Sequence, residues 1–250
     1  MAQKATKKAA AQAAAAPTTT ENASKKQFIS LNRFEVSGNI CERGLKITEN
    51  GTALLTIAHN MGRDREVLFL DIVMFPKNGR KDVQIPTELL KKGQAVLVKG
   101  YQRARVTVDK DGGKHYRIDL VALEITDNTN GESVNRFEVS GNVCERGLKT
   151  FENGAARFTV GHNFGRSKLE PLFIDIVMFP KNGKKDVEIP AELLKKGQAV
   201  IVSGYRRPNN WVDKDGGKHY RLDLVALSLT ENGIETAEAA EAAPETEAEE

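Results

Sequence analysis

An internal duplication covers most of this sequence and limits the folds that it can adopt. The segment NRFEVSGN at residues 32–39 recurs at 135–142, and DIVMFPKNG at 71–79 recurs at 175–183. The other matches between the two copies keep the same order, so each copy has the size of a domain, roughly 100 residues. Solenoid repeats are shorter, at about 20–45 residues, and need more copies to bury a core. The sequence therefore predicts two similar, independently folded domains.

The segments outside the duplication carry opposite charges. Residues 1–26 hold five lysines and one glutamate, whereas residues 231–250 hold eight glutamates and no lysine or arginine. The formal net charge of +3 thus averages a basic body with an acidic tail, and a basic body favours a polyanionic partner. The predicted organisation is a disordered basic Ala/Lys-rich arm at 1–29, a first domain at 30–125, a polar linker at 126–134, a second domain at 135–229 and a disordered acidic tail at 230–250.

Each copy predicts three strands, a short helix and two further strands. In the first copy, Phe34 and Val36 alternate with polar residues, as in a half-buried strand. Pro86 near the start and Gly93 after the end delimit the short helix. The other predicted strands cover 52–58, 69–75, 94–101 and 116–123, with a hairpin tip at 109–113. This is the element order of the OB-fold, a five-stranded Greek-key barrel. The predicted fold class is all-β, with two tandem OB-folds and a short helix in each.

Patterns that would indicate catalysis or metal binding are missing from the sequence. No phosphate-binding loop or nucleophile elbow occurs, and the histidines and cysteines lack metal-ligand spacing. The segment that starts at Asp109 resembles a calcium loop, but Leu120 stands where that loop needs a bidentate glutamate. No run of about eighteen apolar residues could span a membrane. We therefore expect a protein that is not an enzyme, needs no metal or cofactor and has no membrane partner.

The third predicted strand offers candidate binding residues. Its alternation places Phe69 and Phe75 on one face and Leu70, Ile72 and Met74 on the other. The aliphatic set predicts barrel core, which leaves the phenylalanines available to stack on bases beside basic residues. Core packing remains the alternative for any single phenylalanine. The predicted nucleic-acid-binding residues are Arg63, Phe69, Phe75, Lys77, Arg103, Arg105 and Arg117 in the first copy, and Phe164, Arg166, Phe173, Phe179, Lys181, Arg206, Arg207, Trp211 and Arg221 in the second.

An ordered set of segments is similar to the bacterial-type single-stranded DNA-binding protein family. The segments are Asn32-Arg33, Glu49–Ala53, Ile72–Phe75, Leu90–Gly100 and, in the second copy, Trp211–Gly216. The resemblance implies sequence-independent binding and protection of single-stranded DNA in replication, recombination and repair. It also implies base stacking at Phe69, Phe75, Phe173, Phe179 and Trp211.

The resemblance further implies an assembly and a cellular setting. Family members commonly act as four OB domains, so a chain with two domains is expected to form a homodimer. The acidic tail is a candidate contact for replication or repair proteins. The expected location is the cytoplasm, in association with the nucleoid.

Two departures from the family pattern bear on the site. Thr107 stands in the first copy where the second has Trp211, which predicts that the second copy holds DNA more tightly. Asp71 and Asp175 lie where the family often has a basic residue on the binding face, so the path of the strand stays open.

Two alternatives keep the fold and change the function. A tandem OB-fold adaptor for protein assembly would show an exposed apolar patch and little salt-dependent affinity for DNA. An RNA-binding protein is the other alternative, because OB-folds also bind RNA.

Overall fold

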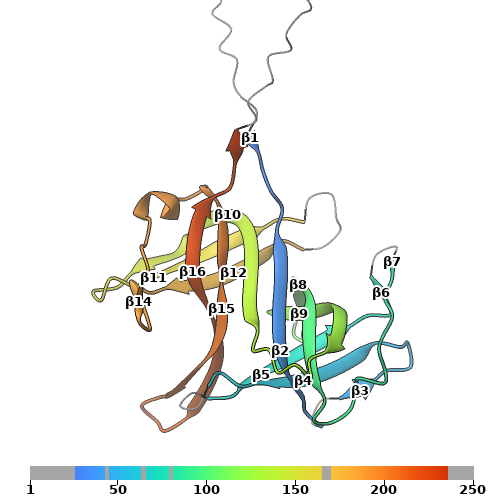
Figure 1. The fold of residues 1–250 in the computed structure, drawn as a ribbon. Coiled ribbons are helices and arrows are strands. Elements are labelled where there is room, and N and C mark those ends of the chain that lie inside the picture. The colour runs from blue at the N-terminus through green and yellow to red at the C-terminus, as the bar shows by residue number, and fades with distance from the viewer. Residues whose placement is uncertain (1–25, 43–44, 63–65, 79–80, 165–169, 236–250) are drawn as a thin grey trace, which may run out of the picture. The chain divides into compact units, whose positions relative to one another are not determined.

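A computed structural model describes residues 26–42, 45–62, 66–78, 81–164 and 170–235 (Figure 1). Residues 28–233 form one compact unit that contains both copies of the duplication. The first domain consists of β2 (Asn32–Ile40), β3 (Lys46–Ile47), β4 (Ala53–His59), β5 (Leu68–Met74), β6 (Lys77–Asn78), β7 (Lys81–Asp82), β8 (Ala95–Val108) and β9 (Lys114–Asp127). The second consists of β10 (Asn135–Thr150), β11 (Ala156–His162), β12 (Leu172–Met178), β13 (Lys181–Asn182), β14 (Lys185–Asp186), the 3₁₀-helix η1 (Ala191–Leu194), β15 (Ala199–Val212) and β16 (Lys218–Glu231).

Both domains are closed barrels built into one continuous sheet. The strand order is β11-β12-β16-β15-β10-β2-β8-β9-β5-β4-β3, and the additional pairings β2–β4 and β10–β11 close the two barrels. The pairings β5–β9 and β12–β16 are parallel, and the other pairings in this sheet are antiparallel. The predicted pair of OB-folds is thereby confirmed.

The core follows the alternation expected from the sequence. In β5 the side chains of Leu70, Ile72 and Met74 are buried, whereas Phe69 and Asp71, which alternate with them along the strand, are exposed. The equivalent residues of β12 alternate in the same way. The duplication therefore preserves the division between the core face and the solvent face of each barrel.

The two domains are joined edge to edge through their first long strands. β2 and β10 pair antiparallel and lie side by side in Figure 1, with Phe34 opposite Phe137. Ion pairs of Arg33 with Glu138 and of Arg136 with Glu35 flank this junction. Each domain thus covers the strand edge that the other would expose.

A bulge shapes the long hairpin of each domain. The pairing register of β8 with β9 shifts between Lys99 and Gly100, and that of β15 with β16 shifts at Gly204. A Cβ atom at Gly100 would lie 1.9 Å from the carbonyl oxygen of Val121, and Gly204 has an equally close neighbour. Because that neighbour is backbone, only glycine fits at the bulge.

The predicted short helix forms in only one of the two domains. In the second domain it is the 3₁₀-helix η1, while the first domain has turns closed by bonds from the amide of Leu89 to the carbonyl of Pro86 (2.9 Å) and from Leu90 to Thr87 (3.3 Å). A segment this short makes few helical hydrogen bonds, so small changes in geometry decide between a 3₁₀ turn and isolated turns.

Two short strands lie where the sequence predicted the arm and the tail. β1 (Lys26–Gln27) pairs antiparallel with β17 (Ile234–Glu235). Next to them, the Asn232 side-chain amide bonds both the amide and the carbonyl of Ile29, at 2.9 Å each. The rest of the predicted arm and tail, 1–25 and 236–250, lies outside the described residues.

Candidate nucleic-acid interface

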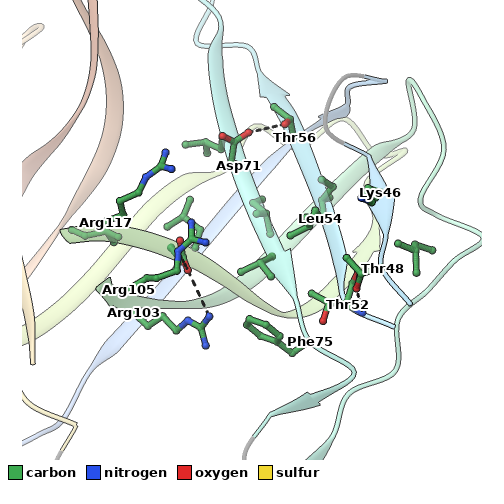
Figure 2. A pocket seen from close by; sticks show the side chains of 18 of the residues that line it. Lys46, Thr48, Thr52, Leu54, Thr56, Asp71, Phe75, Arg103, Arg105 and Arg117 are labelled. Carbon is green, nitrogen blue, oxygen red and sulfur yellow. Dashed lines mark hydrogen bonds and ion pairs between the residues drawn. The ribbon is translucent and has the colours of Figure 1, made fainter. Parts of the chain in front are cut away.

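A groove crosses the first barrel over β3, β4, β5, β8 and β9 (Figure 2). We call it the first groove; its cavity volume is about 1180 Å³. Phe69, Asp71 and Phe75 enter it from β5, and arginines enter it from the β8–β9 hairpin. The second groove is the equivalent cavity beside β11 and β12, with Phe173 and Asp175 in its lining. The chain therefore repeats both the barrel and a concave surface on it.

Exposed phenylalanines supply the flat surfaces of this interface. Phe69 is 53% exposed and Phe173 is 50% exposed, because both stand on the solvent face of their strands. Phe75 and Phe179 are half-buried, each with an arginine guanidinium over the ring. The Arg103 guanidinium lies 4.4 Å from the centre of the Phe75 ring, as Figure 2 shows. These rings are placed to stack against unpaired bases.

Paired arginines share a shielded carboxylate in each groove. In the first domain, Arg103 lies 3.6 Å and Arg105 3.2 Å from Asp119. In the second domain, Arg221 bonds Asp223 at 2.8 Å, and Arg207 lies 4.0 Å from the same side chain. One carboxylate orients two guanidinium groups and neutralises only one of them. Each set therefore keeps a net positive charge that can contact phosphates.

Trp211 extends the aromatic surface along the β15–β16 hairpin. Its ring is 44% exposed and stacks on His219, with 5.1 Å between ring centres and 14° between planes. The tip is fixed by Asp213, which accepts bonds from the Gly217 amide (2.6 Å) and lies 2.7 Å from the His219 ring. The hydrogen bond from His219 lowers the pKa of the Asp213 carboxyl below its ordinary value.

The aspartates in the two grooves have different partners. Asp71 accepts a hydrogen bond from the Thr56 hydroxyl at 2.7 Å. Asp175 has the equivalent bond from Thr159 and also an ion pair of 2.9 Å with Arg157. The second groove thus neutralises a carboxylate that stays negative in the first.

Several residues predicted for the interface lie elsewhere. Lys77 pairs with Asp82 (4.0 Å) in the β6–β7 hairpin, outside the lining of the first groove. Lys181 occupies the equivalent hairpin of the second domain, outside the lining of the second groove. Phe164 is half-buried against the core, edge-on to His162. Arg63 and Arg166 lie outside the described residues.

Arg206 corrects the sequence-based prediction. Its side chain is 0% exposed and lies between Phe34 and Phe137, with the guanidinium 5.2 Å and 5.6 Å from the two ring centres. Its three side-chain nitrogens have no hydrogen-bond partner among the described residues, and burial lowers the pKa of the guanidinium to about 9. Neighbours on a strand face opposite sides, so Arg207 lies beside Asp223, which lines the second groove, whereas Arg206 points into the core.

The sequence-based prediction missed other residues of the second groove. Arg157, Tyr116, Ile118 and Leu222 line the second groove. Alternation with Thr159 along β11 was a signal for Arg157. Leu222 lies on β16 of the same domain, whereas Tyr116 and Ile118 lie on β9 and reach this groove only through contacts between domains, for which the sequence has no local signal.

Five-stranded barrels with exposed aromatics and arginines on one face define the oligonucleotide-binding class of OB-fold proteins. The model of the single-strand binding protein family matches residues 31–127 and again 134–230. The chain therefore belongs to the single-strand binding protein family.

Individual relatives match shorter segments. "Single-stranded DNA-binding protein 1" of Xylella fastidiosa (strain 9a5c) is 43% identical over 42 residues, 17% of this chain and 31% of that protein. "Single-stranded DNA-binding protein" of Clostridium perfringens (strain 13 / Type A) is 35% identical over 74 residues, 30% of this chain and 47% of that protein. The matches thus span about a third and about half of the length of these relatives.

Solved structures share the arrangement of both domains. The wild-type single-stranded DNA binding protein from Thermus aquaticus aligns with a TM-score of 0.56 at 22% identity, over 86% of this chain and 99% of that one. A deletion mutant of the same protein gives 0.53 at 23% identity, over 81% and 94%. At this identity the likeness establishes the fold.

Proposed function

We propose that the chain binds single-stranded DNA without sequence preference and protects it during replication, recombination and repair. The observation that carries this proposal is the pair of exposed phenylalanines, Phe69 and Phe173, on a groove face that also holds arginines. Aromatic rings stack on any base, and guanidinium groups contact phosphates that every nucleotide carries. Binding of this kind requires unpaired bases and needs no catalytic step.

A titration with oligo-dT, followed by the fluorescence of Trp211, tests the proposal. Trp211 is the sole tryptophan of the chain and lies exposed on a hairpin, so a stacked base should quench it. We expect strong quenching, weaker affinity at higher salt and no displacement of the single strand by duplex DNA. Absence of binding at low salt would refute the proposal and favour a protein-assembly adaptor. Equal or tighter binding of oligo-U would favour an RNA-binding protein.

We also propose that two chains form a homodimer with four OB domains. Leu123 and Leu227 are both exposed and hold equivalent places at the bulges of the two long hairpins. A second copy would cover apolar side chains that one chain leaves in water. Light scattering at micromolar concentration should give twice the mass of 27.5 kDa, and a mass of one chain would contradict the proposal.

The acidic tail and the place of action complete the proposed function. The tail carries eight glutamates in residues 231–250 and would contact basic surfaces of replication or repair proteins. A protein with this role works where single-stranded DNA is exposed, at the nucleoid in the cytoplasm. Among the described residues, no helix is long and apolar enough to cross a membrane. Loss of binding to such a partner after removal of residues 236–250 would support the tail's role.

A further inference from the structure

The hairpin of the first domain reaches the binding strand of the second domain. The hydroxyl of Tyr116, on β9, donates a hydrogen bond to the carbonyl of Pro171 at 2.9 Å. The same hydroxyl accepts a bond from the amide of Phe173 at 2.9 Å. Burial at this contact raises the pKa of Tyr116. The stacking residue Phe173 is thus held in place by a side chain of the other domain.

The hairpin of the second domain makes the reciprocal contact. The Tyr220 hydroxyl, on β16, faces the backbone amide of Phe69; burial raises the pKa of Tyr220, and this amide partly offsets the rise. Beside it, the Asn210 side chain donates a hydrogen bond to Glu66, immediately before β5. Asn210 and Tyr220 are cross-strand partners, and Trp211 follows directly. A cavity of about 440 Å³ joins Glu66 to Trp211 and Tyr220. The exposed tryptophan therefore lies by the first domain's binding strand, although its sequence belongs to the second.

The two grooves also meet at their inner ends. Leu222 of the second domain belongs to the lining of the first groove, and Tyr116 and Ile118 of the first domain belong to that of the second. Ile118 and Leu222 hold equivalent places on β9 and β16, and each lines both cavities. The crossing hairpins thus form a shared apolar floor where one groove passes into the other.

We propose that the two grooves form one continuous track for a single DNA strand, in which each hairpin completes the groove of the other domain. In this arrangement Trp211 extends the stacking surface of Phe69 in the first groove. Tyr116 and Tyr220 are positioning residues, because the hydroxyl of Tyr116 bonds the amide of Phe173 and that of Tyr220 faces the amide of Phe69. The inference rests on the proposed binding of single-stranded DNA and assigns the path of the strand.

The test uses a short oligo-dT of about 8 nucleotides, enough for one groove, and the quenching of Trp211 at saturation. Phe69→Ala in the full chain should reduce the amplitude of quenching at least threefold, whereas Phe173→Ala, which removes the equivalent ring from the second groove, should reduce it by clearly less. Greater loss in Phe173→Ala, or equal loss in both variants, overturns the assignment. If the wild-type chain binds no oligo-dT at all, the proposed function itself is wrong.

Conservative tyrosine variants give a second readout. Tyr220→Phe keeps the ring and removes the hydroxyl that faces the Phe69 amide, so we expect the Trp211 quenching by the short oligonucleotide to fall. Tyr116→Phe removes the hydroxyl that bonds Pro171 and Phe173 and should lower that quenching by clearly less. Thermal melting checks that both variants fold. Identical effects of the two variants on quenching would contradict crossed hairpins.

Discussion

The two domains share a barrel and differ on the groove face. The second domain carries Trp211 where the first carries Thr107, and Arg157 where the first carries Leu54. The first domain instead has Arg105, at the position of Asn209. Most buried positions hold an aliphatic or aromatic residue in both copies, and Gln102 and Arg206 are an exception. A substitution on a solvent face changes stability little, whereas one in a packed core usually destabilises the fold. The residues of the two grooves have therefore diverged more than those of the two barrels.

The difference predicts a division of labour between stacking and charge. Trp211 and its His219 neighbour enlarge the aromatic surface that the second domain contributes. Arg103 and Arg105 of the first domain lie close to one carboxylate, Asp119, and among the described residues none gives Asp71 the ion pair that Asp175 makes. The five predictions that follow each test a difference between the two domains.

Removal of the tryptophan should have the largest effect. Trp211→Ala is expected to weaken binding of oligo-dT by about 2–3 kcal/mol, against about 1 kcal/mol for Phe69→Ala, because the indole offers the larger face to a base. Anisotropy of a labelled oligonucleotide measures both variants without tryptophan fluorescence. The reciprocal variant Thr107→Trp should strengthen binding. Equal losses in the two alanine variants would remove the contrast between the domains.

Replacement of the buried Arg206 should have the second largest effect, and this effect is on the stability of the chain. Arg206→Met is expected to stabilise the chain by about 1–2 kcal/mol, because it removes an unpaired buried charge and keeps an apolar stem. For a unit of this size that is roughly 2–4 °C in Tm for each kcal/mol. The first domain has the neutral Gln102 at this place, and Gln102→Met, the matched control, should gain less. A lower Tm for Arg206→Met would show that the two ring contacts outweigh the cost of burial.

The lowered pKa of Arg206 predicts how pH changes the difference in stability between the wild type and Arg206→Met. Above about pH 9 the folded chain releases the proton of Arg206, whereas the unfolded chain still holds it. The free energy of unfolding therefore rises with pH above about 9, and the destabilisation by the buried charge is fully present below that pH. The difference in the free energy of unfolding between wild type and Arg206→Met should narrow as the pH rises from 9 to 10.5. If this difference in the free energy of unfolding stays constant with pH, burial does not lower the pKa of Arg206.

The extra arginine of the first groove should have a smaller effect. Arg105→Ala is expected to weaken binding at low salt by about 1 kcal/mol and to reduce the slope of log affinity against log salt by about 0.7, the value for one phosphate contact on a single strand. Asn209→Ala, at the equivalent place in the second groove, should leave that slope unchanged. A slope that stays constant in Arg105→Ala would mean that Asp119 fully neutralises this side chain.

An ion pair added to Asp71 should give the smallest effect on binding. Leu54→Arg copies Arg157 into the first groove, where it can pair with Asp71. We expect tighter binding by about 0.5 kcal/mol, in the range of an exposed ion pair. Arg157→Leu should produce the opposite change, which a titration with oligo-dT at low salt would detect. Looser binding of Leu54→Arg would show that Leu54 itself contacts the bases.

Part of the candidate site was predictable because a strand alternates with a period of two. Phe69 and Phe173 are exposed as that alternation requires, with their neighbours in the core. The same rule separates Arg207 from the buried Arg206, and applying it strictly would have excluded Arg206 from the predicted interface. Lys77 and Phe164 were harder to place, because the loop or turn after a strand obeys no such period.

The sequence by itself determined the duplication, the OB-fold of each copy and the face on which each strand presents its aromatics. These features depend on local pattern, since the spacing of apolar residues fixes which side of a strand is buried. Only the tertiary structure decided how the copies meet, with Phe34 opposite Phe137 and with each hairpin reaching the other domain's binding strand. Contacts such as Tyr116 with Phe173 join residues far apart in the chain, and no local pattern encodes them. They follow from the bulge at Gly100 and the pairing of β2 with β10, which together set where the hairpins point.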